Sequence, residues 1–229
     1  MKKTALIVTA LTMVAGAAFA AQIPIKGSPH DISGGSGEIC IYCHTPHNAA
    51  IAIPLWNRVN PSPGDFTLYK TSNTLSNATK ASTLSTDSIS LFCMSCHDGS
   101  IALSAVVNAN EEANNGMPND ATGSTTGALS ATNIKNLKKD LSNTHPIGFN
   151  YVTAQGEDSG LREAGAVLGI FKGKDAADGK TTSQNFLYGS NYQTFECASC
   201  HRVHDPGVST NFLRIENEQS DLCLACHIK

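Results

Sequence analysis

The chain repeats one five-residue pattern four times: Cys40-Ile41-Tyr42-Cys43-His44, Cys93-Met94-Ser95-Cys96-His97, Cys197-Ala198-Ser199-Cys200-His201 and Cys223-Leu224-Ala225-Cys226-His227. These stretches contain all eight cysteines of the chain. The pattern is the one through which haem c is attached. Two thioethers reach the vinyl positions at one edge of a porphyrin, and the following histidine turns its imidazole toward the iron. We therefore expect four covalently bound haems c.

Two other kinds of site also use paired cysteines. Exported proteins form disulfides, and C-x-x-C pairs bind zinc. Neither requires a histidine after every second cysteine. Histidine accounts for only 8 of the 229 residues, so its presence at all four places is not expected by chance. Haem attachment is the interpretation that uses every residue of the repeated pattern.

Four histidines lie outside the repeated pattern: His30, His47, His145 and His204. Their number equals that of the second axial positions on four irons. Methionine is the usual competitor for that position, but Met94 lies inside a motif and Met117 lies in a polar stretch. We predict bis-histidine ligation of every iron, with the motif histidines as the proximal ligands: His44, His97, His201 and His227. Irons with two imidazole ligands have no open position for a substrate, which favours electron transfer over catalysis.

His47 and His204 each follow a motif histidine by three residues. Such a residue lies on the proximal side of its own haem, because three residues of helix rise only about 4.5 Å. Pro46 argues against a continuous helix at the first site, although a turn would have the same consequence. Each of the two histidines should therefore reach a different haem. The alternative is that they only hydrogen-bond haem propionates.

The remainder of the chain predicts a scaffold with little regular structure. It is 41% hydrophobic and 6% aromatic, and it has no strong alternating or heptad pattern. We expect a multihaem fold of coil and loop, with short helices wrapped around four haems and little β-structure. The haems would then supply most of the apolar core. Local expectations are a loop over 108–132, a helical turn over 136–141 and a short helix over 220–227.

Two further stretches predict how particular side chains are presented. Pro146 biases His145 toward an extended backbone, and Gly148 permits a turn. Trp56 is the single tryptophan of the chain, and we expect it to pack against a porphyrin edge.

The first twenty residues predict a cleaved secretory signal peptide. Lys2 and Lys3 precede an apolar run that ends in the cleavage pattern Ala18-Phe19-Ala20. The alternative is an uncleaved anchor, but the run is short and ends in small residues. We expect residues 21–229 to form a single tetrahaem domain. Its parts are an N-terminal haem pair at about 30–100, a middle segment at about 101–195 and a C-terminal haem pair at about 196–229.

Charge and hydropathy exclude two classes of partner. The chain has 16 basic and 19 acidic residues, so it lacks the basic field that holds a nucleic acid. No segment after the leader is long and apolar enough to span a bilayer. We therefore expect an exported protein, extracellular or at the cell surface, with the periplasm as the alternative.

The whole arrangement resembles the extracellular tetrahaem c-type cytochromes of metal-reducing bacteria, the filament-forming OmcE type. The resemblance rests on the four motifs, on the C-x-x-C-H-x-x-H stretch that ends at His47, and on a final motif at the chain end. Members of that family polymerise into filaments with a continuous line of stacked haems. The resemblance implies a homopolymer in which His47 ligates a haem of the neighbouring subunit, the one on His201.

The same resemblance implies how the other ligands are distributed. His204 would serve the haem of His227, while His30 and His145 would serve those of His44 and His97.

Three functions are open at this point. The first is a polymerising conduit that passes electrons from other redox cytochromes to external acceptors such as metal oxides. The second is a monomeric periplasmic tetrahaem shuttle. The third is a multihaem reductase, against which full ligation of the irons argues. We expect the first, and we expect no enzymatic activity.

Overall fold

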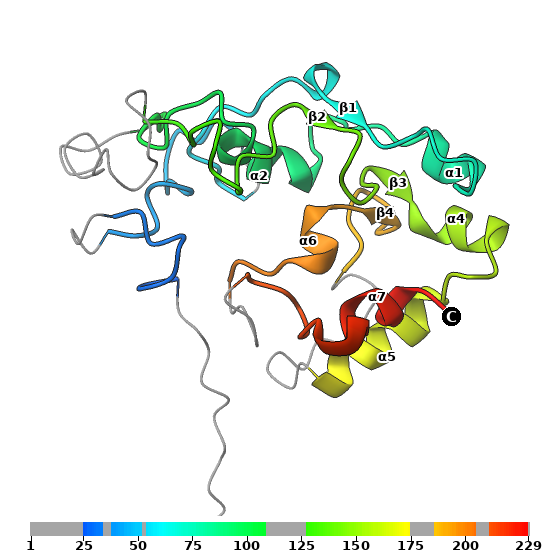
Figure 1. Ribbon diagram of the computed structural model, residues 1–229. Coiled ribbons are helices and arrows are strands. Elements are labelled where there is room, and N and C mark those ends of the chain that lie inside the picture. Colours follow the sequence, from blue (N-terminus) through cyan, green and yellow to red (C-terminus); the bar gives the residue numbers. More distant parts are fainter. Residues whose placement is uncertain are drawn as a thin grey trace, which may run out of the picture.

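Coil, turns and short helices make up most of the backbone in the computed structural model (Figure 1). The structure describes residues 25–33, 38–51, 54–108, 127–174, 186–204 and 211–228. The α-helices in these ranges are α1 (Asn77–Lys80), α2 (Ile89–His97), α4 (Tyr151–Glu157), α5 (Ala164–Lys174), α6 (Cys197–Cys200) and α7 (Asp221–Cys226). Two 3-10 turns are η1 (Pro63–Asp65) and η4 (Glu218–Ser220). The prediction of a mostly coiled chain with short helices is confirmed for these residues.

The described strands are two residues long and form two separate pairs. Strand β1 (Thr67–Leu68) lies parallel to β2 (Asp140–Leu141), and β3 (Phe149–Asn150) lies antiparallel to β4 (Thr194–Phe195). Because β4 leads directly into α6, the second pair connects the middle of the chain to the third motif. The expectation of little β-structure is likewise confirmed for the described residues.

Each of the four motifs forms one turn of helix. The second motif ends α2, while α6 and α7 contain the cysteines of the third and fourth motifs. The first motif forms an isolated turn, in which the backbone NH of His44 donates to the carbonyl of Cys40 (2.8 Å). Residues three apart lie on one side of such a turn. The local fold therefore turns both thiols of a motif in one direction.

A buried hydrogen-bonded link joins the second motif to the third. The hydroxyl of Ser90 in α2 donates to the carboxylate of Glu196, and it accepts the backbone NH of Cys197 (3.0 Å). The Glu196 side chain also caps the first turn of α6 together with Ser199. Helices α2 and α6 are thereby held side by side (Figure 1). The N-terminal and C-terminal motif pairs thus adjoin one another, although the middle segment separates them in the sequence.

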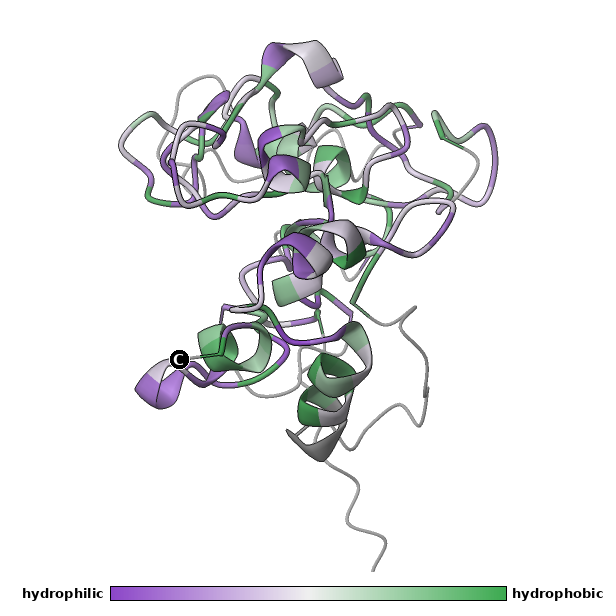
Figure 2. Cartoon of the chain, turned by 90° about the vertical axis from the view of Figure 1, so that its right-hand side faces the viewer, coloured by the Kyte–Doolittle hydropathy of each residue, from purple (hydrophilic) through white to green (hydrophobic). Residues whose placement is uncertain are grey.

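The described residues bury an apolar core of their own. Its centre is a set of aromatic rings from β3, β4, α4, α5 and the segment before β4: Phe149, Phe195, Tyr151, Phe171 and Phe186. In Figure 2 hydrophobic residues gather on several helical segments, while hydrophilic residues are frequent along the coil. The share of the core that the haems supply stays a prediction. Aromatic residues are few in this chain, but five of them meet in one place.

The helical turn expected at 136–141 is wrong. Asp140 and Leu141 form β2, and Lys138 adopts a positive φ of 60° that interrupts any helix. The side-chain amide of Asn136 donates to the carbonyls of Leu129 and Ser130 (2.9 and 3.1 Å). Asparagine side chains compete with helical hydrogen bonds in this way, and the apolar spacing alone gave no sign of it.

The other local expectations have different outcomes. The C-terminal helix is confirmed as α7, and Ser220 occupies its N-cap position without a capping hydrogen bond. Most of the loop expected at 108–132 lies outside the described residues, as does the leader. In the described part of the chain, no helix combines the length and apolar character needed to cross a bilayer.

Gly148 offers a test of the turn that follows His145. Its φ is 73°, and a Cβ there would lie 2.5 Å from the carbonyl oxygen of Thr83. We expect Gly148→Ala to lower the free energy of unfolding by about 1–3 kcal/mol. Gly156, inside α4, is the matched control, because a Cβ there meets no atom within 4 Å.

Gly156→Ala should raise the free energy of unfolding by about 0.5–1 kcal/mol. Urea titration followed by circular dichroism measures both changes. Equal effects of the two substitutions would contradict the described turn.

Candidate haem sites

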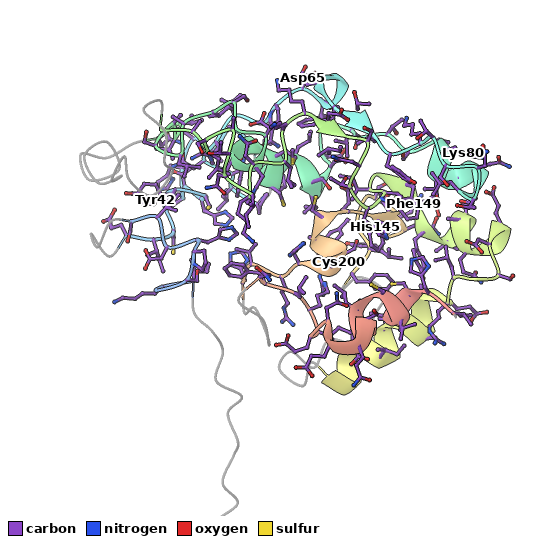
Figure 3. All side chains as sticks on the ribbon, viewed as in Figure 1. Tyr42, Asp65, Lys80, His145, Phe149 and Cys200 are labelled. Atoms are coloured by element: carbon purple, nitrogen blue, oxygen red, sulfur yellow. The ribbon has the colours of Figure 1, made fainter. Side chains whose placement is uncertain are left out.

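The four motifs lie in space in the order of the sequence. Cys43 lies close enough to Cys96, and Cys200 to Cys226, for one thiol to act on the other electrostatically, while Cys93 and Cys197 interact through a hydrogen bond. Each of these pairs joins one motif to the next. Figure 3 shows Tyr42 of the first motif at one side of the molecule and Cys200 of the third near its centre. Helices α2, α6 and α7 follow one another in the same direction in Figure 1.

The eight cysteines, all of them in the described residues, form no disulfide with one another. Burial raises the pKa of Cys43 to about 11, that of Cys200 to about 12 and that of Cys226 to about 11. In the described residues, which contain all the cysteines and histidines, no three His, Cys, Asp or Glu side chains gather as metal ligands would. Structural zinc requires four such ligands around one point. The arrangement does not fit a zinc site.

Three of the motif histidines are fixed by backbone carbonyls. Nδ1 of His44 lies 2.8 Å from the carbonyl oxygen of Pro54, and Nδ1 of His97 and His201 lies 2.8 and 2.9 Å from those of Lys135 and Asn211. A carbonyl can only accept, so Nδ1 carries the proton and donates. Nε2 is then left with its lone pair free to bind a metal. The chain therefore orients these imidazoles as ligands.

Three motif histidines each face a histidine from outside the motifs. The ring centroids of His44 and His204 are 5.7 Å apart, those of His97 and His30 are 6.0 Å apart, and those of His227 and His145 are 6.4 Å apart. A metal–imidazole bond of about 2.0–2.1 Å on each side would place two ring centres about 6 Å apart. The separations fit an iron bound between the two rings of each pair.

The facing histidines are suited to ligation because they are neutral at pH 7. Burial and the nearby rings of His97 and His201 lower the pKa of His30 to about 4. Loss of hydration also lowers the pKa of His145 and His204. In addition, Nδ1 of His145 donates to the carbonyl of Pro146 (2.9 Å), which leaves its Nε2 free. A neutral imidazole is the form that binds a metal.

The observed pairs differ from the distribution that the resemblance implied. His204 faces the first motif and not the fourth, and His145 faces the fourth. His30 faces His97, which belongs to one of the two haems that the resemblance assigned to His30 and His145 together. His204 does face a motif other than its own, and this agrees with the argument from its spacing. The reason for the difference is the fold: α6 turns the chain after His201 back toward the first motif.

Two histidines have no facing partner. No ring contact joins His47 or His201 to another histidine within the described residues, and both are exposed. His201 is nevertheless oriented by Asn211, like the other motif histidines. The backbone of His47 is held by Thr45 and Asn108, whose side chains donate to its carbonyl (2.8 and 3.2 Å). The imidazole of His47 therefore projects from an ordered loop.

Two aromatic residues support the histidine pairs. Phe212 stacks on His30 with ring centroids 4.6 Å apart, and Trp56 contacts His44 edge-on at 5.6 Å. The sequence singled out Trp56 but gave no sign of Phe212, which reaches the N-terminal segment only through the fold. Whether Trp56 also meets a porphyrin edge stays a prediction.

Comparison with known proteins agrees with this description for the C-terminal part. A family model for the doubled CXXCH motif matches residues 191–229, which contain the third and fourth motifs. A search of curated proteins found no match. The matched motif is typical of multihaem c-type cytochromes and indicates covalently bound haem c. The match supports a haem protein of electron transfer.

The pairing of His204 with the first motif can be tested by its spectroscopic consequence. We expect His204→Ala to leave the iron at Cys40 and Cys43 with one protein ligand, because the two imidazoles face one another. Electron paramagnetic resonance should then show a new high-spin signal from one haem.

The same substitution in two proteins that each lack one pair of haem-attaching cysteines shows which haem has lost its ligand. The signal should be absent when Cys40 and Cys43 are also replaced by alanine, and it should persist when Cys223 and Cys226 are replaced instead. The reverse result would assign His204 to the fourth motif.

Proposed function

We propose that the chain is a tetrahaem c-type cytochrome that transfers electrons through four haems c. The observation that carries the proposal is the set of three histidine pairs, 5.7 to 6.4 Å apart. One imidazole of each pair donates its Nδ1 proton to a backbone carbonyl and so keeps Nε2 free, and two rings at that separation fit an axial pair on one iron. Bound haem iron would supply one-electron oxidation and reduction.

In this proposal the residues divide into three roles. The thiols that form thioethers are Cys40, Cys43, Cys93, Cys96, Cys197, Cys200, Cys223 and Cys226. The proximal ligands are His44, His97, His201 and His227, and the backbone carbonyls fix three of these rings. The second ligands are His204, His30 and His145 within the chain, and His47 for the remaining iron.

Occupation of both axial positions of an iron by histidine supports electron transfer over catalysis. Catalytic haems keep one axial position open or weakly held, whereas a facing imidazole fills it. The order of the motifs adds a second argument, because a thiol of each motif lies near a thiol of the next. Cofactors attached in that order would form one continuous line through the molecule.

The unpaired histidines support a polymer. His201 is oriented as a ligand without a facing histidine in its own chain, and His47 is an exposed imidazole without a motif to serve. Ligation of the His201 haem by His47 of a second copy would satisfy both. It would also continue the line of haems from one copy to the next, which gives a filament.

The proposed filament implies where the protein is located and which redox partners it has. We propose cleavage after Ala20, export, and a position outside the cell or at its surface. Other redox cytochromes would donate electrons, and external acceptors such as metal oxides would receive them. A monomeric periplasmic shuttle would have the same internal chemistry and would differ only in assembly.

The assembly is tested by removal of the exposed ligand. We expect His47→Ala to retain four covalently bound haems by mass spectrometry and to form no filaments in electron cryomicroscopy. One haem should become high-spin, and added imidazole should return it to low-spin without restoring filaments. Asn48→Gly is the matched control, since it removes a side chain from the same exposed loop and glycine accepts the positive φ of 53° found there.

The possible outcomes of these measurements distinguish the filament from the monomeric shuttle. Filaments formed by His47→Ala would disprove ligation between copies. Isolated wild-type particles with four low-spin haems would support the monomeric shuttle. Fewer than four attached haems in the wild type would disprove the tetrahaem cytochrome itself.

A further inference from the structure

Three of the four motifs, the first, third and fourth, end their helical turn at the second cysteine. The next residue, the motif histidine, forms a β-bridge in all three. The last carbonyls of such a turn have no donors within it. The second motif differs, because α2 continues through His97 and the backbone NH of Asp98 donates to the carbonyl of Met94 (3.2 Å). The three shorter turns therefore take donors from elsewhere in the chain.

A single residue supplies two of these donors at the third motif. The backbone NH of Arg214 donates to the carbonyl of Cys200, the second cysteine (2.9 Å). Its Nε donates to the carbonyl of Ala198, the residue after the first cysteine (3.0 Å). The side chain and the backbone of one residue thus hold both ends of the turn.

The first and fourth motifs are held in the same way by residues unrelated in sequence position. Arg162 donates from its backbone NH and its Nε to the corresponding two carbonyls of the fourth motif (2.8 and 3.0 Å). Asn57 donates from its backbone NH and its side-chain amide to those of the first motif (2.8 and 2.7 Å). We call the three segments that end at these residues the straps: 54–57, 159–162 and 211–214.

Each strap also holds the histidine of its motif. The residue before the last one in each strap forms the β-bridge to that histidine: Trp56, Leu161 and Leu213. In two straps the first residue, Pro54 or Asn211, is the one whose carbonyl accepts from Nδ1 of the histidine. A strap therefore positions both the turn that carries the thiols and the residue that would bind iron.

Two of the three straps end in an arginine, so they also bring a permanent positive charge to the motif. Burial raises the pKa of Cys200 and Cys226, and the charges of Arg214 and Arg162 respectively oppose that rise. Neither arginine has a carboxylate within ion-pair distance among the described residues. Their charges are therefore not neutralised by a described acidic side chain.

We propose that Arg214 and Arg162 are positioning residues of the third and fourth haem sites and that their charge raises the reduction potential of the haem held there. The inference rests on the proposed covalent haems. A fixed positive charge favours the reduced iron, because reduction adds one negative charge to the site. Asn57 makes the same two bonds without a charge, so holding the turn and setting the potential are separable roles.

The two arginines should differ in strength. Arg214 is buried, and its Nη2 donates to the hydroxyl of Tyr188 (2.9 Å). Arg162 is half-buried. Water and salt screen a buried charge less than an exposed one. Arg214 should therefore have the larger effect on its haem.

The role of the charge is tested by redox titration of the haem-loaded protein, with the midpoint potentials of the four haems followed by visible absorbance. We expect Arg214→Asn to lower one midpoint and to keep four attached haems by mass spectrometry. Arg162→Asn should lower one midpoint by a smaller amount. Lys80→Asn is the matched control, since it removes an exposed positive charge at the end of α1 and should leave every midpoint unchanged.

The haem that responds is identified by removal of its attachment site. The shift caused by Arg214→Asn should be absent when Cys197 and Cys200 are also replaced by alanine. It should persist when Cys223 and Cys226 are replaced instead.

The role of the hydrogen bond is tested at Arg162, which also covers the possibility that Arg214→Asn does not fold. Arg162→Leu removes the donor to the carbonyl of Leu224, whereas Arg162→Asn retains an amide donor, as Asn57 does. Both substitutions remove the same charge. We expect Arg162→Leu to lower the fraction of chains with four haems by mass spectrometry and Arg162→Asn to restore it.

Two results would overturn the proposal. One is a full set of unchanged midpoints in Arg162→Asn, and in Arg214→Asn if it folds, with four haems attached, because the charges would then not act on the irons. The other is a fraction of four-haem chains in Arg162→Leu equal to that of the wild type, because the bond would then not hold the turn. A wild-type protein with fewer than four attached haems would instead disprove the proposed function.

Discussion

Two imidazoles that face one another at the span of an iron are the interaction on which the rest of this structure depends. One member of each pair directly follows the second cysteine of its motif, and the other comes from a distant part of the chain. The pair of His44 with His204 joins the first motif to the loop after the third. The pair of His145 with His227 joins the middle segment to the last motif. Such pairs tie together a chain that has little regular secondary structure.

The polypeptide prepares these pairs through ordinary hydrogen bonds and packing. Backbone carbonyls fix the tautomer of three of the four motif histidines, which leaves Nε2 free to bind a metal. The aromatic cluster at β3 and β4 holds the strand pair that leads into α6. Ser90 and Glu196 then fix α6 against α2. Side-chain packing and these hydrogen bonds thus hold the second and third motifs next to one another.

Local sequence predicted the short elements unevenly, for identifiable reasons. The helix at α7 was predictable because most of it is the fourth motif, although Ser220 at its N-cap makes no capping hydrogen bond. The turn expected at 136–141 failed because the side chain of Asn136 bonds the backbone of residues 129 and 130, and so competes with a helix. Phe212, which stacks on His30, could not be found at all, since its role arises only when two ends of the chain meet.

The sequence by itself determined the chemistry of attachment. Cysteine spacing and the adjacent histidine act within five residues, so they can be interpreted without a fold. Equal numbers of spare histidines and second axial positions likewise come from counting. The tertiary structure decided which histidines face one another, the order of the motifs in space, and that His47 and His201 face none. These properties depend on contacts between residues far apart in the chain, which the packing of α2 on α6 and the burial of the aromatic cluster bring together.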